Sequence, residues 1–439
     1  MAFICPFRAY RYNPAIVGDF AKVVTQPFDK IGPDLQQEYC RRSPYNVVHI
    51  TRSLEKNDNP DTDYAQAGLT YRKWIGDVVL MQEQAPAIYA YSQEYEVEGE
   101  KRVQRGFIAL VDLRRSAAGI MPHERTLAEP KMDRLRLMRS IESNEDSIYM
   151  LYTDDKLSVD RVVADETSGR KPDIKVADDF GVVHRVWAIV NPKALKLIQD
   201  AMVRGELFIA DGHHRFETAV TFMNECDARG WKPGAVESFD KRIVTCFNSA
   251  GQAITILPTH RLVRDLPDFE PRSFLKSAKR YFEVHAARSA SVLWDQMRFE
   301  QENHVFGFYS QRRFHLLRLT EEGRTDPTMF AHPEAYRDLD VSILHTLILE
   351  GICGIDEAKL VAQSHVDYAR EREWCVRQVD EGKYQAAFFL NPTTVEQVQR
   401  VALLGERMPQ KSTDFYPKLL SGLVFMKMSI QKPPERQSG

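Results

Sequence analysis

The sequence predicts a mixed α/β fold in two parts, followed by a short tail. Compact runs rich in β-branched and aromatic residues alternate with segments whose apolar residues recur at helical spacing. The pattern is interrupted between Pro258 and Pro271, where Leu266-Pro267-Asp268 stands, and this interruption marks a domain boundary. We therefore expect domains at residues 1–265 and 266–428, with a disordered tail at 429–439.

The first domain is expected to alternate short strands with amphipathic helices. The expected strands are compact and apolar, and they are Val47–Ile50, Ala87–Tyr91, Gly106–Val111, Ile148–Tyr152, Val186–Val190 and Leu207–Ala210. The expected helices carry apolar residues on one face, and they are Asp63–Val78, Lys131–Ile141, Pro192–Val203 and Glu217–Arg229. This alternation is typical of a helix-covered sheet.

The second, smaller domain is expected to be α+β. Its expected helices are one starting at Arg272, a strongly apolar one over Val341–Ile352, and an amphipathic one over Thr394–Leu404. Its expected strands are Phe306–Tyr309, Phe314–Leu317 and Ala386–Leu390.

Composition favours a protein that binds a small molecule. The 59 basic and 62 acidic side chains give a formal net charge of -3, which exerts no general attraction on nucleic acid or anionic lipid. The six cysteines lack metal-ligand or disulfide spacing, and this fits a reducing compartment. No stretch reaches the roughly eighteen apolar residues of a membrane span, and the start has no signal-peptide pattern. We therefore expect a cytoplasmic protein with no nucleic-acid or membrane partner; its oligomeric state is left open.

The most informative stretch runs from Leu207 to Ala219, where an apolar strand enters a glycine turn and then a helix. Gly212 lets the backbone approach a ligand closely, and the helix start favours an anion. His213, His214 and Arg215 add donors, of which Arg215 can fork onto two phosphate oxygens. The stretch therefore predicts a phosphate site. The alternative is an ordinary surface helix capped by Asp211, with an incidental histidine pair.

Two further segments carry chemistry suited to a second substrate. His123-Glu124-Arg125 follows a strand, so that Glu124 could accept a hydroxyl proton and Arg125 could hold a phosphate or carboxylate. A solvated Glu-Arg pair is the alternative there. Lys411-Ser412-Thr413 offers a cation and two hydroxyls in a turn between Pro409 and Pro417, where the alternative is a polar loop.

Together these segments resemble the DUF 1015 family, which falls in the superfamily of the ParB nuclease-like and sulfiredoxin folds and includes the free-serine kinases. The turn at Asp211–Arg215 matches the phosphate-contacting strand-turn-helix of that superfamily. Pro122-His123-Glu124 and Pro409-Gln410-Lys411-Ser412-Thr413 match the upstream and C-terminal segments of the free-serine kinases, in the same order. The resemblance covers the chain from about Met121 onward. The residues before it would form an N-terminal extension to a ParB/sulfiredoxin-like nucleotide-binding domain.

The resemblance implies a kinase that phosphorylates the hydroxyl of free L-serine, using Mg²⁺ with ATP or ADP. Glu124 would be the general base, and His213 and His214 would also act in catalysis. The nucleotide phosphates would be held by Asp211, Gly212, His213, His214 and Arg215. The amino-acid or phosphoserine end would be contacted by His123, Arg125, Lys411, Ser412 and Thr413. Asp414-Phe415 departs from the Arg-His that the small kinases carry, and so removes positive charge from that pocket.

Other functions of the superfamily explain these residues less well. Sulfiredoxin chemistry needs a cysteine where His213 and His214 stand. DNA binding would need a basic surface or a helix-turn-helix. We expect no metal site at the histidine pair, because neighbouring side chains on a helix diverge by about 100°. A non-catalytic protein that binds nucleotide as a regulatory signal remains the alternative to a kinase.

Overall fold

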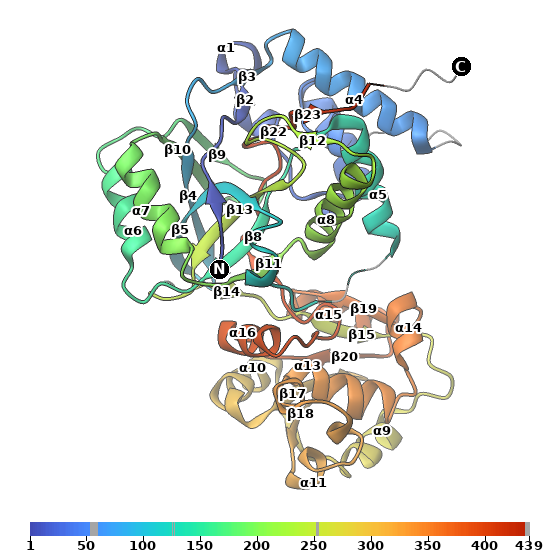
Figure 1. Cartoon of the computed structure of the whole chain (residues 1–439). Helices are drawn as coiled ribbons and strands as arrows, with labels where there is room; N and C mark the ends of the chain where they lie inside the picture. Colours follow the sequence, from blue (N-terminus) through green and yellow to red (C-terminus); the bar gives the residue numbers. More distant parts are fainter. Residues whose placement is uncertain (53–59, 125, 127, 252–253, 435–439) are drawn as a thin grey trace. The chain divides into compact units, whose positions relative to one another are not determined.

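A computed structural model describes residues 1–52, 60–124, 126, 128–251 and 254–434, and divides the chain into two compact units (Figure 1). The first unit contains residues 1–122, 126–254 and 417–439, and the second contains residues 123–125 and 255–416. The mixed α/β fold predicted from the sequence is confirmed. Each unit has its own sheet, and we describe each by itself.

The described residues of the first unit build a nine-stranded mixed sheet. In spatial order its main path is β6 (Ile120–Met121), β11 (Leu207–Asp211), β8 (Ile148–Tyr152), β13 (Lys241–Asn248), β5 (Glu100–Asp112), β4 (Ile88–Val97), β10 (Val183–Ile189) and β9 (Ile174–Ala177), with β1 (Ile4–Cys5) on β5. The pairs β6–β11 and β8–β13 are parallel, and the other pairs are antiparallel. Hydrophobic residues throughout β8 and β13 are buried, as is usual for strands covered on both faces.

Helices cover both faces of this sheet, with α6 (Ser158–Thr167) and α7 (Pro192–Met202) on one side and α5 (Ala128–Ile141) and α8 (His213–Ala228) on the other (Figure 1). Helix α4 (Pro60–Gly76) packs on α5. The shorter helices of the unit are α1 (Pro14–Val17), α2 (Pro33–Arg42), α3 (Val48–Thr51), and the 3-10 turns η1 (Phe20–Lys22), η2 (Phe28–Lys30) and η3 (Ala117–Gly119).

The expected strand at Val47–Ile50 is wrong, since these residues belong to the helical turn α3 and the residue before it. The side chain of Asn46 accepts a hydrogen bond from the backbone N–H of Val48 at 2.9 Å and so starts the turn. A four-residue apolar run does not by itself distinguish a buried strand from a buried helix.

The second unit is organised around a six-stranded antiparallel sheet. Its spatial order is β16 (Phe282–Ala287), β18 (Arg313–Leu319), β17 (Val305–Ser310), β20 (Ala386–Phe389), β15 (His260–Val263) and β19 (Val366–Ala369). A separate two-stranded pair joins β14 (Thr255–Ile256) to β21 (Phe415–Tyr416). The helical segments are α9 (Pro271–Ala278), α10 (Ala290–Phe299), η4 (Gln301–Asn303), α11 (Glu321–Arg324), η5 (Met329–Ala331), α12 (Glu334–Arg337), α13 (Asp340–Ile343), the π-helix η6 (Leu344–Glu350), α14 (Glu357–Ala362), α15 (Arg372–Asp380) and α16 (Val395–Leu403).

The boundary between the units differs from the expected one at residues 265 and 266. Strand β15 precedes that point, yet it pairs with β19 and β20 and therefore belongs to the second unit. The prolines between Pro258 and Pro271 flank this strand and do not separate two domains.

The last described segment returns to the first unit, so the expected second domain does not extend to residue 428. Strand β22 (Met426–Lys427) pairs with β7 (Ser143–Asn144), and β23 (Ile430–Gln431) pairs with β12 (Lys232–Pro233). The expected disordered tail is therefore wrong for residues 430 and 431, while residues 435–439 lie outside the described part of the chain. A third small pair joins β2 (Tyr10–Tyr12) to β3 (Leu80–Gln82).

The returning segment completes a hydrophobic cluster of the first unit. Phe425 is fully buried, and its ring lies 5.5 Å from that of Tyr12 and 6.1 Å from that of Tyr71. The backbone carbonyl of Phe425 also accepts a hydrogen bond from the N–H of Tyr10 at 2.9 Å. Residues from the two ends of the sequence thus share one core.

We expect Phe425→Ala to lower the free energy of unfolding by about 3–5 kcal/mol, because it leaves a cavity in this cluster. Chemical denaturation monitored by fluorescence measures the loss. Phe299→Ala is the matched control, since that ring is 92% exposed and its removal should change stability little. Equal effects of the two substitutions would show that the returning segment does not stabilise the first unit.

Candidate phosphate turn and second-substrate segment

The glycine turn in which we expect a phosphate site lies where β11 meets α8 in the first unit. Gly212 has a φ of +99°, a conformation that residues with a side chain rarely adopt. A Cβ at this position would lie 2.9 Å from Nε of Arg215. The turn therefore requires glycine for its conformation and for the close packing of Arg215.

Gly212 is also the N-cap of α8, and a glycine has no side chain to accept from the helix start. An α-helix leaves the N–H groups of its first turn without acceptors inside the helix, and its dipole adds partial positive charge there. His213 is buried and His214 is partly buried at this end. The alternative of a helix capped by Asp211 is wrong, because the cap is Gly212.

Asp211 instead forms ion pairs within the first unit. One of its carboxylate oxygens lies 3.1 Å from Nζ of Lys418 and 3.6 Å from Nη2 of Arg215. Burial opposes ionisation, but the charges of Lys418 and Arg215 outweigh it and hold the pKa of the Asp211 carboxyl well below its usual value. Asp211 is therefore an anion at neutral pH, fixed in place by two cations.

The expectation that Arg215 forks onto a phosphate is not supported by its position. The side chain is only 5% exposed, and Nη1 donates a hydrogen bond to the backbone carbonyl of Ser147 at 2.5 Å. The guanidinium also lies 3.6 Å from a carboxylate oxygen of Asp146. The Arg215 side chain thus points into the protein, where it packs against Gly212 and forms an ion pair with Asp211.

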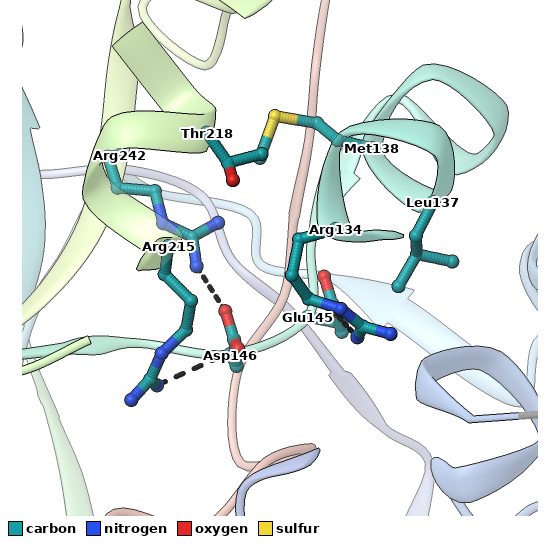
Figure 2. Close-up of a pocket in the computed structure, with 8 residues that line it drawn as sticks. All are labelled: Arg134, Leu137, Met138, Glu145, Asp146, Arg215, Thr218 and Arg242. Carbon is teal, nitrogen blue, oxygen red and sulfur yellow. Dashed lines mark hydrogen bonds and ion pairs between the residues drawn. The ribbon is translucent and has the colours of Figure 1, made fainter. Parts of the chain in front are cut away.

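A small recess behind the turn is lined by buried charges (Figure 2). Asp146 lies between Arg215 and Arg242, and its carboxylate accepts a hydrogen bond from Nη2 of Arg242. Nη1 of Arg134 lies 3.9 Å from the carboxylate of Glu145. This cluster is not among the residues predicted from the sequence, although the acidic pair Glu145-Asp146 shortly before an apolar strand was an available signal.

The recess contains a buried carboxyl group with a raised pKa. Burial, and after it the charge of Asp146, raise the pKa of Glu145 to about 7. Glu145 therefore takes up a proton within the neutral range, at a point directly behind the turn.

In the second unit, the structure brings two distant sequence motifs together. Nε2 of His123 lies 3.2 Å from the hydroxyl of Thr413, 290 positions along the chain. The backbone N–H of Met408 donates to the carbonyl of His123 at 2.7 Å, and Glu124 pairs with Met408 as a single parallel bridge. The segment that carries Glu124 is therefore held against the Lys411–Thr413 turn.

Hydrogen bonds donated by Arg261 and Ser412 hold the backbone around the Lys411–Thr413 turn. Lys411 is exposed and has a φ of +57°, and its carbonyl accepts a hydrogen bond from Nη2 of Arg261 at 3.2 Å. The hydroxyl of Ser412 donates to the carbonyl of Pro409 at 2.5 Å. Ser412 thus uses its proton within the turn, while the Lys411 side chain projects from it.

Asp414 does not leave an unbalanced negative charge beside this turn. Both of its carboxylate oxygens accept from the guanidinium of Arg370, and the bond to Nη2 is 2.7 Å long. The expected loss of positive charge at Asp414-Phe415 is therefore offset by Arg370, from a distant part of the sequence.

The predicted site residues are thus distributed over both units. The first unit carries Asp211, Gly212, His213, His214 and Arg215, and the second carries His123, Glu124, Lys411, Ser412 and Thr413. Arg125 lies outside the described residues. The assignment of both groups to one kinase site, which the resemblance implies, stays a prediction.

The described part of the chain contains no group of three or more His, Cys, Asp or Glu side chains arranged to hold a metal ion. None of the helices described is long and apolar enough to cross a membrane.

The mixed sheet and the glycine turn between β11 and α8 define an α/β protein, and the sequence assigns it to a family. The model "Protein of unknown function (DUF1015)" matches residues 4–342, so the chain belongs to the DUF1015 family. The resemblance to this family seen in the sequence motifs is thereby confirmed, and the match begins at residue 4, well before Met121, where we expected the similarity to start. A comparison with curated proteins gives no match.

Several solved structures resemble the chain distantly. A free serine kinase in complex with AMP is 12% identical, with 72% of this chain and 90% of that chain covered and a TM-score of 0.36. A conserved hypothetical protein from Pyrococcus furiosus is 12% identical, covering 71% and 93%, with a TM-score of 0.34. C-terminally truncated SbnI from Staphylococcus aureus is 9% identical, covering 72% and 85%, with a TM-score of 0.36. At these values the likeness assigns no role to any residue of this chain.

We expect Gly212→Ala to lower the free energy of unfolding by about 1–3 kcal/mol, because the new side chain strains the backbone and meets Arg215. Denaturation of the purified variant measures the change. Gly205→Ala, in the loop before β11, is the control, since nothing lies within 4 Å of its Cβ position and its φ is not positive. A Gly212→Ala variant as stable as Gly205→Ala would contradict the strained turn.

We also expect Glu145 to give stability a pH dependence. Its folded pKa is raised, so the folded state holds the proton more tightly than the unfolded chain and loses stability as pH rises from about 4.5 to about 7. Glu145→Gln, which cannot ionise, should remove that decline in unfolding experiments between pH 5 and 8. The exposed Glu129→Gln should retain it, and an unchanged profile in Glu145→Gln would refute this assignment.

Proposed function

We propose that this protein is a nucleotide-dependent kinase that phosphorylates the hydroxyl of a free amino acid, L-serine to O-phosphoserine. The observation that carries the proposal is the glycine turn at the start of α8, where Gly212 has a φ of +99° and the N-cap makes no side-chain hydrogen bond to the helix start. Such a helix start binds phosphate groups through backbone N–H groups and the helix dipole. The choice of serine as the second substrate comes from the sequence motifs that this chain shares with the free-serine kinases.

In this proposal the first unit holds the nucleotide phosphates. Gly212 allows the phosphates to approach the backbone, and His213 and His214 stand at the helix end where charge develops during transfer. Arg215 acts as a positioning residue, because its buried guanidinium fixes Asp211. This replaces the forked phosphate contact expected from the sequence.

ATP or ADP would enter with Mg²⁺ bound to its phosphates. Mg²⁺ is commonly held by one or two carboxylates together with substrate phosphates and waters, without a dedicated protein cage. Asp211, which stays ionised at neutral pH and is 23% exposed, is the residue of the turn that would hold the ion. When bound, the ion neutralises charge on the phosphoryl group being transferred.

The second unit supplies the groups for the amino acid. Glu124 takes the hydroxyl proton of serine as the serine oxygen forms its bond to phosphorus and the bond to the nucleotide oxygen breaks. The His123–Thr413 hydrogen bond fixes the segment before Glu124, and Lys411 projects as a cation for the acidic end of the substrate.

The test combines purified full-length protein with ATP or ADP, Mg²⁺ and a panel of hydroxy amino acids, and detects phosphorylated amino acid by mass spectrometry. We expect Glu124→Gln to lower kcat at least about 100-fold while nucleotide affinity stays unchanged, because the amide cannot take a proton. Glu129→Gln, an exposed change on α5, is the control and should keep full activity.

Two results would contradict the proposal. Nucleotide binding without phosphorylation of any hydroxy amino acid would favour the regulatory alternative. Full activity in Glu124→Gln would remove the assigned base.

A truncation before Gly405 would delete the Lys411–Thr413 turn, but it does not test that turn alone. It also removes Lys418 and Phe425 from the first unit.

A further inference from the structure

The second unit contains a buried arginine that has no counter-ion among the described residues. Arg261, on β15, is 1% exposed. It donates from Nη1 to the carbonyl of Thr259 and from Nη2 to the carbonyl of Lys411, at 3.2 Å for the latter. Within the described part of the chain no carboxylate pairs with it, and burial lowers the pKa of Arg261 to about 10. By contrast, Arg264 near the end of the same strand is paired with Asp265 and Asp367, each at 2.8 Å.

Several buried polar atoms near Arg261 also have no hydrogen-bond partner among the described residues. They include Nε of Arg261 itself, the hydroxyl of Tyr368 and Nε2 of His345. Tyr368 stands directly opposite Arg261 in the β15–β19 pair, so both side chains lie on the same face of the sheet, with the guanidinium carbon 5.4 Å from the ring centre. Burial, and after it the charge of Arg261, lower the pKa of His345 well below its usual value.

Burying Arg261 without a bound anion is unfavourable for the free energy of folding. A buried guanidinium without an anion loses its hydration, and two carbonyl groups replace only part of it. A free Nε–H beside an Nη–H forms the edge of arginine that binds both oxygens of a carboxylate or phosphate. Arg261 thus has the unused donors and the unbalanced charge that an oxyanion would satisfy.

We propose that Arg261 is the buried anchor of an oxyanion site in the second unit, with Tyr368 as a further donor, and that it binds the carboxylate of a small organic acid. Arg261 braces the turn from which Lys411 projects, so the site adjoins the segment assigned to the amino acid. The identity of this acid as the substrate amino acid rests on the proposed function. A phosphate group offers the same oxygens, and the experiment separates the two sources.

The experiment titrates full-length protein, without nucleotide, with L-serine, acetate and inorganic phosphate at constant ionic strength, by calorimetry. We expect saturable binding of L-serine and acetate, stronger than that of phosphate. Arg261→Met should weaken carboxylate binding about tenfold or more, because a charge-assisted forked contact is lost. Tyr368→Phe, which removes one hydroxyl, should weaken it less and keeps the test valid if Arg261→Met does not fold.

Arg264→Met is the matched control, because it removes an arginine that already has carboxylate partners. It should bind the carboxylates as the parent does. The thermal unfolding midpoint supplies a second readout: L-serine should raise the midpoint of the parent and of Arg264→Met but not that of Arg261→Met, whereas a purely structural role of Arg261 would leave this rise unchanged in all three.

The proposal is overturned if the parent binds neither carboxylate, if Arg261→Met binds them as tightly as the parent, or if phosphate alone binds. These results are distinguishable from failure of the kinase assignment. Arg261-dependent carboxylate binding without any phosphorylated product supports the site and removes the kinase. Phosphorylation of L-serine that is unchanged in KM by Arg261→Met supports the kinase and removes the site.

Discussion

The ion pair between Asp211 and Lys418 connects the glycine turn at Gly212 to the rest of the first unit. Lys418 is buried, and its backbone carbonyl accepts a hydrogen bond from Gln93 at 2.9 Å. Gln93 in turn accepts from Gln104, whose side-chain oxygen accepts from Tyr149 at 3.3 Å. A buried chain of polar groups thus runs from the turn across the central sheet, and each member depends on its neighbours for a partner.

Two buried arginines illustrate different uses of the same side chain. Arg215 lies between Asp146 and Asp211, so its charge is balanced by the protein and its function is to hold other groups. Arg261 has carbonyl groups as its acceptors and no balancing anion in the described chain. The first arrangement is complete without a ligand, whereas the second is satisfied best when an anion binds.

Periodicity predicted the elements that position the glycine turn at Gly212, including β8, β11, α5 and most of α8, because each has a long enough apolar pattern. It did not predict β13, a central strand, because this strand begins with the charged residues Lys241 and Arg242. Charged residues are usual in exposed segments, so they conceal the start of a buried strand. The inward direction of Arg215 also depends on Asp146 and Ser147, which lie 69 and 68 positions earlier. Neither partner is visible in the local sequence around the helix start.

The insertion of the second unit between two parts of the first has a consequence for biosynthesis. A chain emerging from the ribosome presents the strands of the first sheet early, but Lys418 and Phe425 follow only after the whole second unit. Until then Asp211 lacks one of its two cations, and the cluster around Tyr12 lacks one of its rings. The turn of the nascent first unit therefore reaches its final electrostatic state only late in translation.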